Sequence, residues 1–536
     1  MPRNNTANSS KDSLLVPVIT PFTPPETPPI IRHLSASQYG QKPLELNSHG
    51  YHYVLTGNTL LPDARIRDLI ARALTAKGAV TALNNAYHHE GYFLVAIKAD
   101  VQGKVIRIQI IQGQLTQAHM VDDIAGFFPC IKYRPDLREN TIVYQSVLAN
   151  AFAQRNGQRL QIGFGPSSNP GGSRMNVSET PIPGYQPFTG NVFFGNYGSR
   201  YSGRYLTGGS VSYNPGLGLN ISVNGTQGLP SLTAASRGSQ YSQGGINASS
   251  ITPWGIYSFN AQWVHYRLGN VAYPINPTGN IFTWGLGGSQ LVYANDRSRW
   301  TVNEGYNHVS NDVKVYQSVI PGGYPLTVQH YNYFDVGTQW SLSYNLLHKP
   351  GSLNTSLTYN QGVNGSHGTL YNRTPGYPAA QFHYFVTSIS TSQALPLGMS
   401  ASFSASGQGA FNTLPQQNQW VLGGFGSLSA YYPGVLVGDS GYSARFQLQS
   451  PGWAFHGFST SANLFAETGG TNYTYLARNQ APWQSLSDVG LGVNMQSPWG
   501  TSISVMSALP VGWNQVSASV RKASRVDAYF VLSQNF

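Results

Sequence analysis

Apolar and polar side chains alternate along most of the chain after about residue 185. In residues 334–345 the even positions hold Phe, Val, Thr, Trp, Leu and Tyr, and the odd positions hold Asp, Gly, Gln, Ser, Ser and Asn. The same alternation recurs in residues 217–223, 257–263 and 353–359. Successive side chains of a β-strand point to opposite faces, so the pattern predicts many strands separated by turns rich in Gly, Asn and Pro.

The polar face of these strands carries Ser, Asn, Gln and Gly rather than Lys and Glu, and only 10% of all residues are charged. An ordinary soluble protein has roughly a quarter. Aromatic residues are abundant, with 33 Tyr, 23 Phe and 10 Trp. A membrane β-barrel, with lipid outside and a water-filled lumen inside, fits these features better than a soluble β-sandwich or propeller.

The length of this region indicates the size of the barrel. Residues 186–536 number 351, and sixteen strands would give roughly 22 residues per strand and connection, as alternating short and long loops require. Phe536 ends the chain on the same alternating face as Phe530 and Leu532, which is typical of the last strand of an outer-membrane barrel. No segment has the roughly 18 consecutive apolar residues that a spanning helix needs.

A helical period appears only before this region. After a strand at 51–57, apolar side chains recur at intervals of three and four residues, and a second such run follows and stops at Gly91. The positions are Ile66, Leu69, Ile70, Ala73 and Leu74 in the first run and Val80, Leu83 and Tyr87 in the second. Alternation in 93–99 and 105–111 then predicts two strands, beneath which Ile66, Leu69, Ile70 and Leu74 are expected to pack.

The remaining segments are less regular. Residues 116–181 suggest one helix around 144–151 and two strands, LQIGF and RMNVSE, without a legible first helix. Residues 1–50 are polar and Pro-rich and read as a linker. The opening 22 residues lack a convincing signal peptide. Since an outer-membrane protein must cross the inner membrane, we expect a displaced start or a removed leader.

Candidate chemistry is sparse. The net charge is +11, but no basic cluster interleaved with aromatic residues indicates nucleic-acid binding. The single cysteine, Cys130, reads as a packing residue, and adjacent side chains in His88-His89-Glu90 would diverge on a helix rather than bind a metal. No nucleotide-binding glycine motif and no nucleophile–base pair is present. We therefore predict no enzymatic activity, cofactor or metal.

Several motifs resemble the TpsB family of two-partner secretion transporters (the ShlB/FhaC/HecB haemolysin secretion and activation proteins). TGNTLLPDARIRDLI and YHHEGYFLVAIKADVQGKVIRIQIIQGQL are similar to a first POTRA domain, with Gln112 where the family has an acid. FGPSSNPGGSRMNV resembles the end of a second POTRA, and GNYGSRYSGRYLTGGSVSYNPGLGLN the first barrel hairpin. LGGFGSLSAYYPGVLVGDSGYSARFQL resembles the long loop that folds back into the lumen.

The resemblance implies a mainly β fold, with a 16-stranded antiparallel transmembrane barrel preceded by two small α+β POTRA domains. The implied divisions are a Pro-rich segment and linker at 1–50, POTRA 1 at 51–115, a divergent POTRA 2 at 116–184, and a barrel at 185–536 whose inward loop lies near 423–442. The protein would lie in the bacterial outer membrane as a monomer, with its POTRA domains in the periplasm. Its expected partners are a secreted polypeptide and outer-membrane lipid or lipopolysaccharide.

One departure concerns the loop tip, where the family carries V-R-G-Y or V-R-G-F. Here Leu428, Ser429, Ala430 and Tyr431 stand in that place, so the arginine is absent. The family arginine meets an acid in an F-x-D-x-G run of the barrel wall, and the matching residues are Phe465, Glu467 and Gly469. An unpaired buried charge is costly, so Glu467 is expected to be solvated, protonated or paired with another group such as Arg445.

The loop is nevertheless expected to lie inside the lumen, held less firmly than in relatives. Its predicted residues are Gly423, Gly424, Ser427, Leu428, Ser429, Ala430, Tyr431, Gly438, Asp439, Gly441 and Tyr442. Client binding and the POTRA fold are assigned to Gly57, Asn58, Gly91 and Tyr92. Here an unfolded client would add a strand to a POTRA sheet edge.

Three functions remain open from the sequence. The first is a translocase that secretes an unfolded haemolysin-like or adhesin-like partner from the periplasm to the cell surface. The second is a passive or gated pore for small solutes, which the missing loop arginine makes more credible. The third is a relative of barrel-assembly proteins. Adjacent reading frames, and conductance measured without a client, would discriminate among them.

Overall fold

The computed structural model describes residues 42–536 except 135, 170–171, 200–202, 233–237, 270–271, 273–274, 316–323, 369–376 and 477–480. The possible leader and most of the linker predicted for 1–50 lie outside the described residues. Contacts divide the chain into an N-terminal unit that ends at Tyr185 and a barrel unit that begins at Gln186, with residues 294–296 grouped with the former. None of the helices in the described residues has the length and hydropathy to cross a bilayer.

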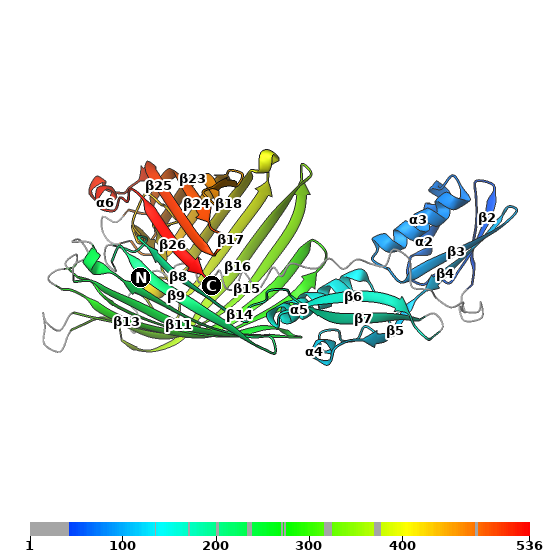
Figure 1. Cartoon of the computed structure of the whole chain (residues 1–536), viewed down its shortest axis with the longest axis horizontal. Coiled ribbons are helices and arrows are strands. Elements are labelled where there is room, and N and C mark those ends of the chain that lie inside the picture. The colour runs from blue at the N-terminus through cyan, green and yellow to red at the C-terminus, as the bar shows by residue number, and fades with distance from the viewer. Residues whose placement is uncertain are drawn as a thin grey trace. The chain divides into compact units, whose positions relative to one another are not determined.

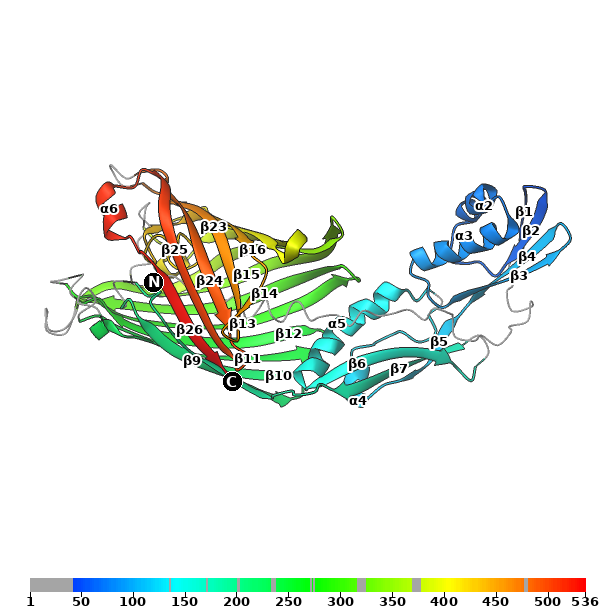
Figure 2. The ribbon, with the colours of Figure 1, turned by 45° about the horizontal axis from the view of Figure 1, so that its top comes forward.

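The first small domain is a four-stranded sheet with two helices on one face (Figure 2). Its elements are β1 (Leu44–Ser48), β2 (Tyr51–Thr56), α2 (Asp63–Arg72), α3 (Ala76–His89), β3 (Val95–Gln102) and β4 (Val105–Gln112). The strand order is β1-β2-β4-β3, with β2 and β4 parallel. The reading of residues 1–50 as linker is wrong for β1, whose alternating side chains are too few to signal a strand without its partner β2.

The core of this domain lies between the helices and the sheet. Ile66 and Ile70 are fully buried against Ile106, Ile108 and Ile110 of β4, as predicted, and Leu69 is partly buried beside them. The prediction for Leu74 is wrong, since its side chain is 78% exposed. Helix α2 ends at Arg72 and the backbone turns extended at Ala73, so the helical spacing no longer directs residue 74 toward the sheet.

The second small domain contains a three-stranded sheet, β5-β7-β6, and one long helix. Its elements are β5 (Gln114–His119), α4 (Asp122–Ala125), α5 (Glu139–Arg155), β6 (Gln158–Pro166) and β7 (Gly172–Pro181). The helix and both strands expected from the sequence are present. The helix that was not legible is α4, whose four residues are too few to establish a helical period.

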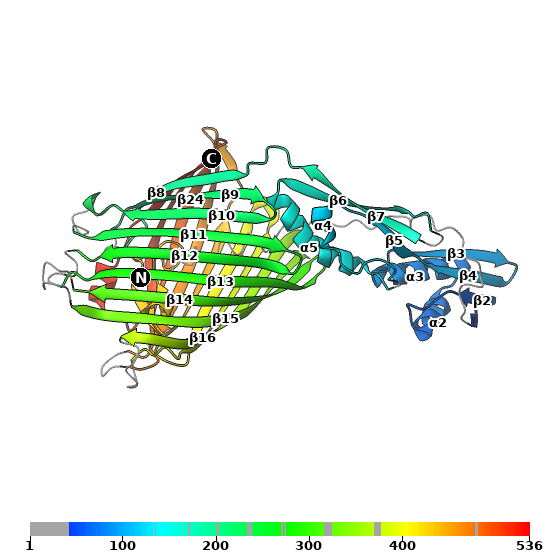
Figure 3. The same ribbon diagram turned by 90° about the horizontal axis from the view of Figure 1, so that it is seen from below.

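The barrel closes on itself because its last strand pairs with its first, from Val531–Gly195 to Asn535–Asn191. Consecutive strands lie side by side (Figure 3). The wall strands are β8 (Phe188–Gly195), β9 (Leu206–Gly216), β10 (Leu219–Gly228), β11 (Gln240–Thr252), β12 (Gly255–Arg267), β13 (Thr278–Ala294), β14 (Ser298–Lys314), β15 (Pro325–Leu346), β16 (Lys349–Gly368), β17 (His383–Ala394), β18 (Ser400–Ala410), β21 (Ser440–Gln449), β22 (Trp453–Phe455), β23 (Phe458–Asn472), β24 (Gln484–Gln496), β25 (Thr501–Asn514) and β26 (Tyr529–Asn535). Since β22 continues β21 along β23, the described residues form the predicted sixteen-stranded antiparallel barrel.

The alternation along the wall separates a lipid-facing surface from a lumen-facing one. In β15, Phe334, Val336 and Trp340 are 40–56% exposed, whereas Tyr331 and Tyr333, on the opposite face, are buried. Large apolar side chains on the outside of a closed barrel have lipid as their solvent. The short turns, such as 217–218 and 253–254, lie at one end of the barrel, and long connections lie at the other. Figure 1 shows the short helix α6 (Ala518–Ala523) in one such long connection.

The core of the first small domain gives a test of this packing. Ile66→Ala should lower the free energy of unfolding of that domain by about 2–5 kcal/mol, because it truncates a fully buried side chain. Leu74→Ala should change it by less than about 0.5 kcal/mol as a surface substitution. Hydrogen exchange of the β2 and β4 amides in the full chain measures both. Equal effects of the two variants would contradict the described core.

Candidate functional site

The segment between β18 and β21 folds back against the inner wall rather than forming only an external loop. Its strands β19 (Trp420–Leu422) and β20 (Leu436–Gly438) pair as a separate hairpin. The bend beyond them needs left-handed backbone, and Gly423, Gly424, Gly426 and Gly434 have φ between +81° and +105°. Only glycine adopts these angles at little cost. We call residues 411–439 the inward loop and residues 428–431 its tip.

The tip is buried against lumen-facing side chains of the wall. Leu428, Ser429, Ala430 and Tyr431 are all at most 2% exposed. Leu428, Ala430 and Tyr431 form one apolar cluster with wall residues Phe465, Leu486, Met506, Ala508 and Tyr529. Two predicted loop residues lie elsewhere: Gly441 and Tyr442 belong to wall strand β21, and the Tyr442 side chain is 40% exposed, on the lipid-facing side.

Three charged side chains stand in one row across adjacent strands beneath the tip. Arg445 of β21 lies opposite Glu467 of β23, which lies opposite Asp488 of β24. Arg445 forms an ion pair with Glu467, and its guanidinium lies 4.3 Å from the centre of the Phe465 ring. We call Arg445, Glu467 and Asp488 the charge row. Of the alternatives open for Glu467, the structure brings this carboxylate together with Arg445.

Backbone N–H groups of the tip, rather than an arginine side chain, donate hydrogen bonds to the charge row. The Ser429 N–H donates to Glu467 Oε2 at 2.6 Å, and the Ala430 N–H donates to Asp488 Oδ2 at 2.9 Å. Hydrogen bonds from N–H groups to a buried carboxylate are stronger than neutral ones. The tip is therefore attached to the charge row without any cationic side chain of its own.

The tip is also attached to the connection between β25 and β26. Val526 N–H donates to Ala430 O at 2.9 Å, and Tyr432 N–H donates to Ser524 O at 2.8 Å, so Tyr431 and Arg525 form an antiparallel bridge. The Tyr529 hydroxyl donates to Tyr431 O at 2.7 Å. Sequence reasoning missed Asp488 and this connection. The scarcity of charge could have indicated Asp488, because it is the sole charged residue of β24.

Other contacts fix the base of the inward loop. Buried Asp439 accepts hydrogen bonds from the Leu414 and Thr474 N–H groups, both at 2.9 Å. Asn418 hydrogen-bonds Tyr331 and donates to the Tyr384 hydroxyl at 2.8 Å. These bonds attach the base of the loop to Tyr331 of β15, to Tyr384 of β17 and to Thr474 just after β23, separately from the tip.

The residues assigned to client binding in the first small domain make internal contacts. Asn58 Oδ1 accepts from the Leu61 N–H at 3.1 Å and from the Tyr87 hydroxyl at 2.7 Å. Gly57 O accepts from Gln112 Nε2 at 2.8 Å, so Gln112 closes this turn without an acidic group.

The other two assigned residues lie where the first small domain meets α5. Gly91 O accepts from the Glu139 N–H at 2.8 Å, and the buried Tyr92 hydroxyl accepts from Arg138 Nη2 at 2.7 Å. Nearby, the hydrogen bond from Arg65 holds the pKa of Glu90 below its usual range. Glu90 is thus engaged in an ion pair rather than in a metal site.

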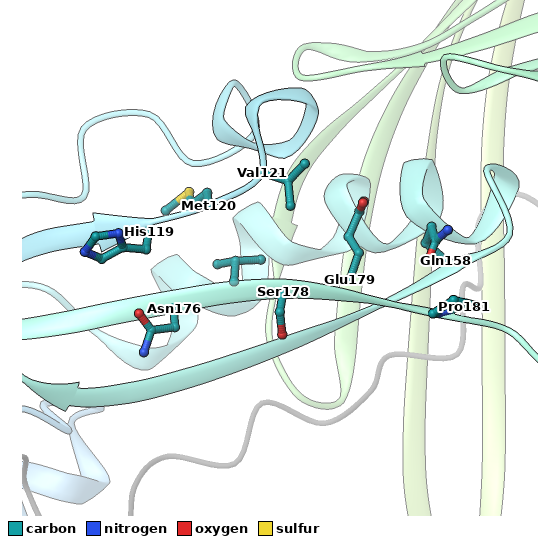
Figure 4. A pocket seen from close by; sticks show the side chains of 9 residues that line it. His119, Met120, Val121, Gln158, Asn176, Ser178, Glu179 and Pro181 are labelled. Atoms are coloured by element: carbon teal, nitrogen blue, oxygen red, sulfur yellow. The ribbon is translucent and has the colours of Figure 1, made fainter.

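A hollow of about 670 Å³ lies beside β7 in the second small domain (Figure 4). It is lined by His119, Met120 and Val121, where the chain leaves β5, and by Gln158, Asn176, Val177, Ser178, Glu179 and Pro181 of β6 and β7. No sequence pattern indicates this hollow, because it depends on where one strand ends beside another. Burial, and then the charge of Asp123, raise the pKa of Glu179.

The hollow borders an unpaired strand edge. Pairing of β5 with β7 ends at His119–Asn176, whereas β7 pairs with β6 up to Pro181. Hydrogen-bonded and non-hydrogen-bonded residue pairs alternate along the antiparallel ladder of β7 with β6. The Ile182 N–H donates to Gly157 O at the end of this ladder, so Glu179, three residues before Ile182, falls in a non-hydrogen-bonded pair. The N–H and C=O groups of Glu179 therefore point away from β6. Within the described chain no strand covers that side of Glu179, so an extended peptide could pair there.

Within the residues that the structure describes, no group of three or more His, Cys, Asp or Glu side chains could hold a metal ion. The features with functional geometry are thus the inward loop on its charge row and the open edge of β7. Both suit the handling of a polypeptide chain or the opening of a lumen.

Comparison with known proteins supports this assignment. The family model "Haemolysin secretion/activation protein ShlB/FhaC/HecB" matches residues 171–495, which is more than half of the chain. The chain belongs to this family. It is an outer-membrane β-barrel transporter of two-partner secretion with N-terminal periplasmic domains, not an enzyme.

Individual members of the family are distant in sequence. The outer membrane transporter CdiB of Dickeya dadantii is 23% identical over 455 residues, covering 80% of this chain and 75% of that protein. The structure of CdiB from Escherichia coli matches with a TM-score of 0.74 at 19% identity, over 99% of this chain and 96% of that one. CdiB from Acinetobacter baumannii gives 0.68 at 14%, over 99% and 97%. These structures establish a shared fold.

We expect the ion pair of the charge row to help keep the inward loop inside the barrel. Arg445→Gln would leave two buried carboxylates without their guanidinium, and breaking a buried ion pair costs about 3–5 kcal/mol. We expect single-channel recordings to show a severalfold higher open probability. Arg445→Lys should have a smaller effect because it keeps the charge.

A double variant controls for general damage to the barrel. Arg445→Gln combined with Glu467→Gln removes both charges of the pair, so its open probability should lie closer to that of the unmodified protein. Heat-modifiable mobility confirms that each barrel has folded. An open probability of Arg445→Gln equal to that of the unmodified protein would show that the charge row does not hold the loop.

Proposed function

We propose that this transporter secretes an unfolded partner polypeptide of the haemolysin or adhesin type from the periplasm to the cell surface. The observation that carries the proposal is the inward loop. It packs against the inner wall through hydrogen bonds at its tip that can break and re-form without opening the wall itself. A lumen meant to stay open would need no such segment.

The client would be captured at the open edge of β7. An added strand gains backbone hydrogen bonds from the sheet whatever its sequence, which suits an unfolded client. The hollow beside Glu179 leaves room for its side chains. Gly57, Asn58, Gly91 and Tyr92 would serve capture indirectly, by holding the first small domain and its junction with α5.

Passage would follow release of the tip. The client enters the lumen when the bonds of Ser429 and Ala430 to the charge row break, while Asn418 and Asp439 hold the base of the loop. The periplasm contains no ATP, so folding of the client outside the cell would supply direction. No residue of the chain needs to act chemically.

A gated pore for small solutes is the second candidate. Serine stands at position 429 in place of the family arginine, and this favours the gated pore. The two hydrogen bonds that backbone N–H groups donate at the tip lack the charge of a guanidinium. Steady conductance without any client, together with the failure of the transporter to export any protein, would favour this alternative.

Proline substitution at the open edge tests capture. Glu179→Pro removes an N–H that faces the hollow while leaving the ladder with β6 intact. One lost backbone hydrogen bond, at about 1 kcal/mol, corresponds to roughly fivefold weaker binding. Affinity is measured with the full transporter and an unfolded fragment of the protein encoded next to it.

Glu179→Gln is the matched control, since it removes the side-chain charge and retains the N–H. It should bind the fragment like the unmodified protein. Equal loss of affinity in both variants would attribute binding to the carboxylate, and no loss in either would exclude this edge.

A reversible crosslink tests whether the tip must move. Tyr431 and Arg525 form a non-hydrogen-bonded antiparallel pair, whose Cα atoms lie about 4.5 Å apart, within the range of a disulfide. In a Cys130→Ser background, Tyr431→Cys with Arg525→Cys should block secretion when oxidised and restore it on reduction. Each single cysteine variant controls for loss of the native side chain. Undiminished secretion by the oxidised, fully crosslinked protein would refute passage past a displaced tip.

A further inference from the structure

The tip is hydrogen-bonded to the rest of the barrel through its main chain. Two N–H groups and two carbonyl groups of residues 429–431 bond the wall or the connection between β25 and β26. Among the described residues, no side chain of the tip makes such a bond: Ser429 Oγ accepts from the Gly426 N–H of the loop itself at 3.2 Å, and the buried Tyr431 hydroxyl has no partner. A polypeptide of another sequence could therefore make the same polar contacts.

The tip has the form of a tight turn. The Tyr431 N–H donates to Leu428 O at 3.0 Å, which closes a turn of four residues. The N–H groups of the two central residues take no part in this closing bond. Here they belong to Ser429 and Ala430 and point at the two carboxylates of the charge row. Any polypeptide turn of this kind presents the same pair of donors.

We call the surface beneath the tip the recess. It consists of Glu467, Asp488, Phe465, Leu486, Met506 and Tyr529 of the wall, together with residues 524–526. When the tip leaves, each of the two carboxylates loses a hydrogen-bond donor, and the apolar side chains face the water of the lumen. Both changes are unfavourable. Displacement of the tip is therefore easier when another polypeptide takes its place.

We propose that the recess binds a turn of the client during passage, in the place that the tip leaves. The identity of this occupant rests on the proposed function, since it requires a client in the lumen. The side chain in the place of Ala430 has to be small, because that residue is fully buried. Unfolded chains turn most readily at Gly, Ser and Asn, so segments of this composition should bind. While the client occupies the recess, the tip cannot return.

The first test supplies a turn to a vacant recess. Replacement of residues 423–435 by Asn-Gly removes the tip and joins β19 to β20 through a two-residue hairpin turn. The affinity of a labelled peptide with the sequence of residues 424–434 is measured by fluorescence anisotropy on the otherwise complete protein. The peptide should bind this variant at least tenfold more tightly than the unmodified protein, whose own tip fills the recess.

Point variants provide a second route to the vacant recess. Ala430→Asp places a third carboxylate against the charge row and should expel the tip, so it should bind the peptide like the variant without a tip. Ser427→Asp is the matched control, because it adds the same charge at a partly exposed position of the loop. It should bind the peptide as weakly as the unmodified protein. Heat-modifiable mobility verifies that each barrel has folded.

A modified peptide tests recognition of the main chain. Methyl groups on the nitrogens that correspond to Ser429 and Ala430 remove both donors and keep every side chain, so binding should weaken at least tenfold. A peptide with alanine in the place of Ser429 should keep its affinity, because the Ser429 hydroxyl bonds only within the loop. Equal binding of methylated and unmethylated peptides, or no binding to a folded barrel without its tip, overturns the site.

Crosslinking during secretion tests the client as occupant. A diazirine amino acid of similar size in place of Met506, in the recess, should crosslink to the client severalfold more than one in place of Ser356. Ser356 lies opposite Gln339 on the lumen-facing side of β16, away from the recess. Equal crosslinking at both positions while the client is secreted would overturn the client as occupant. Absence of the client from the medium would instead refute the proposed transport, so the two failures are distinct.

Discussion

A backbone amide in hydrocarbon finds no water to bond, and this constraint governs the barrel. Every wall strand must have two neighbours, so the last strand has to return to the first. The short seam between β26 and β8 meets this demand, and the terminal residue extends it: Phe536 exchanges backbone hydrogen bonds with Gly190 in both directions. The outward face can then be apolar and aromatic, and polar groups have a place inside.

The same constraint makes the inside of the wall a setting where few charges have large effects. Glu467 and Asp488 are at most 4% exposed, and a single guanidinium stands beside them. Two amides of the loop tip supply the remaining donors. Attachment through main-chain groups does not depend on which side chain occupies position 429, which explains how the loop is docked with a serine there.

Patterns local in sequence were predictable, and contacts between distant segments were not. Alternation identified the wall strands, and helical spacing identified α2 and α3, because each depends on neighbours within one element. Leu74 was misplaced because a helix can end before its apolar pattern does. The loop motif indicated Glu467 and offered Arg445 as its partner, but Asp488 and Tyr529 meet the tip only through barrel closure. The hollow beside Glu179 likewise exists because the pairing of β5 with β7 ends at Asn176, five residue pairs before the ladder of β7 with β6 ends at Pro181.

The wall strands differ widely in length. β15 has 22 residues and β26 has seven. At about 3.3 Å per residue and a tilt near 40°, β15 rises about 55 Å, roughly twice the apolar band of about 25 Å. Its lipid-facing side turns polar above Phe334, where Asn332 bonds His308 and His330 bonds Asp312 at 3.0 Å. The rim at the long-loop end is therefore uneven in height: β14–β16 extend far beyond the apolar band with hydrated side chains, whereas β26 and β8 end close to it. A polypeptide that left the barrel past β26 and β8 would meet the bilayer surface at once.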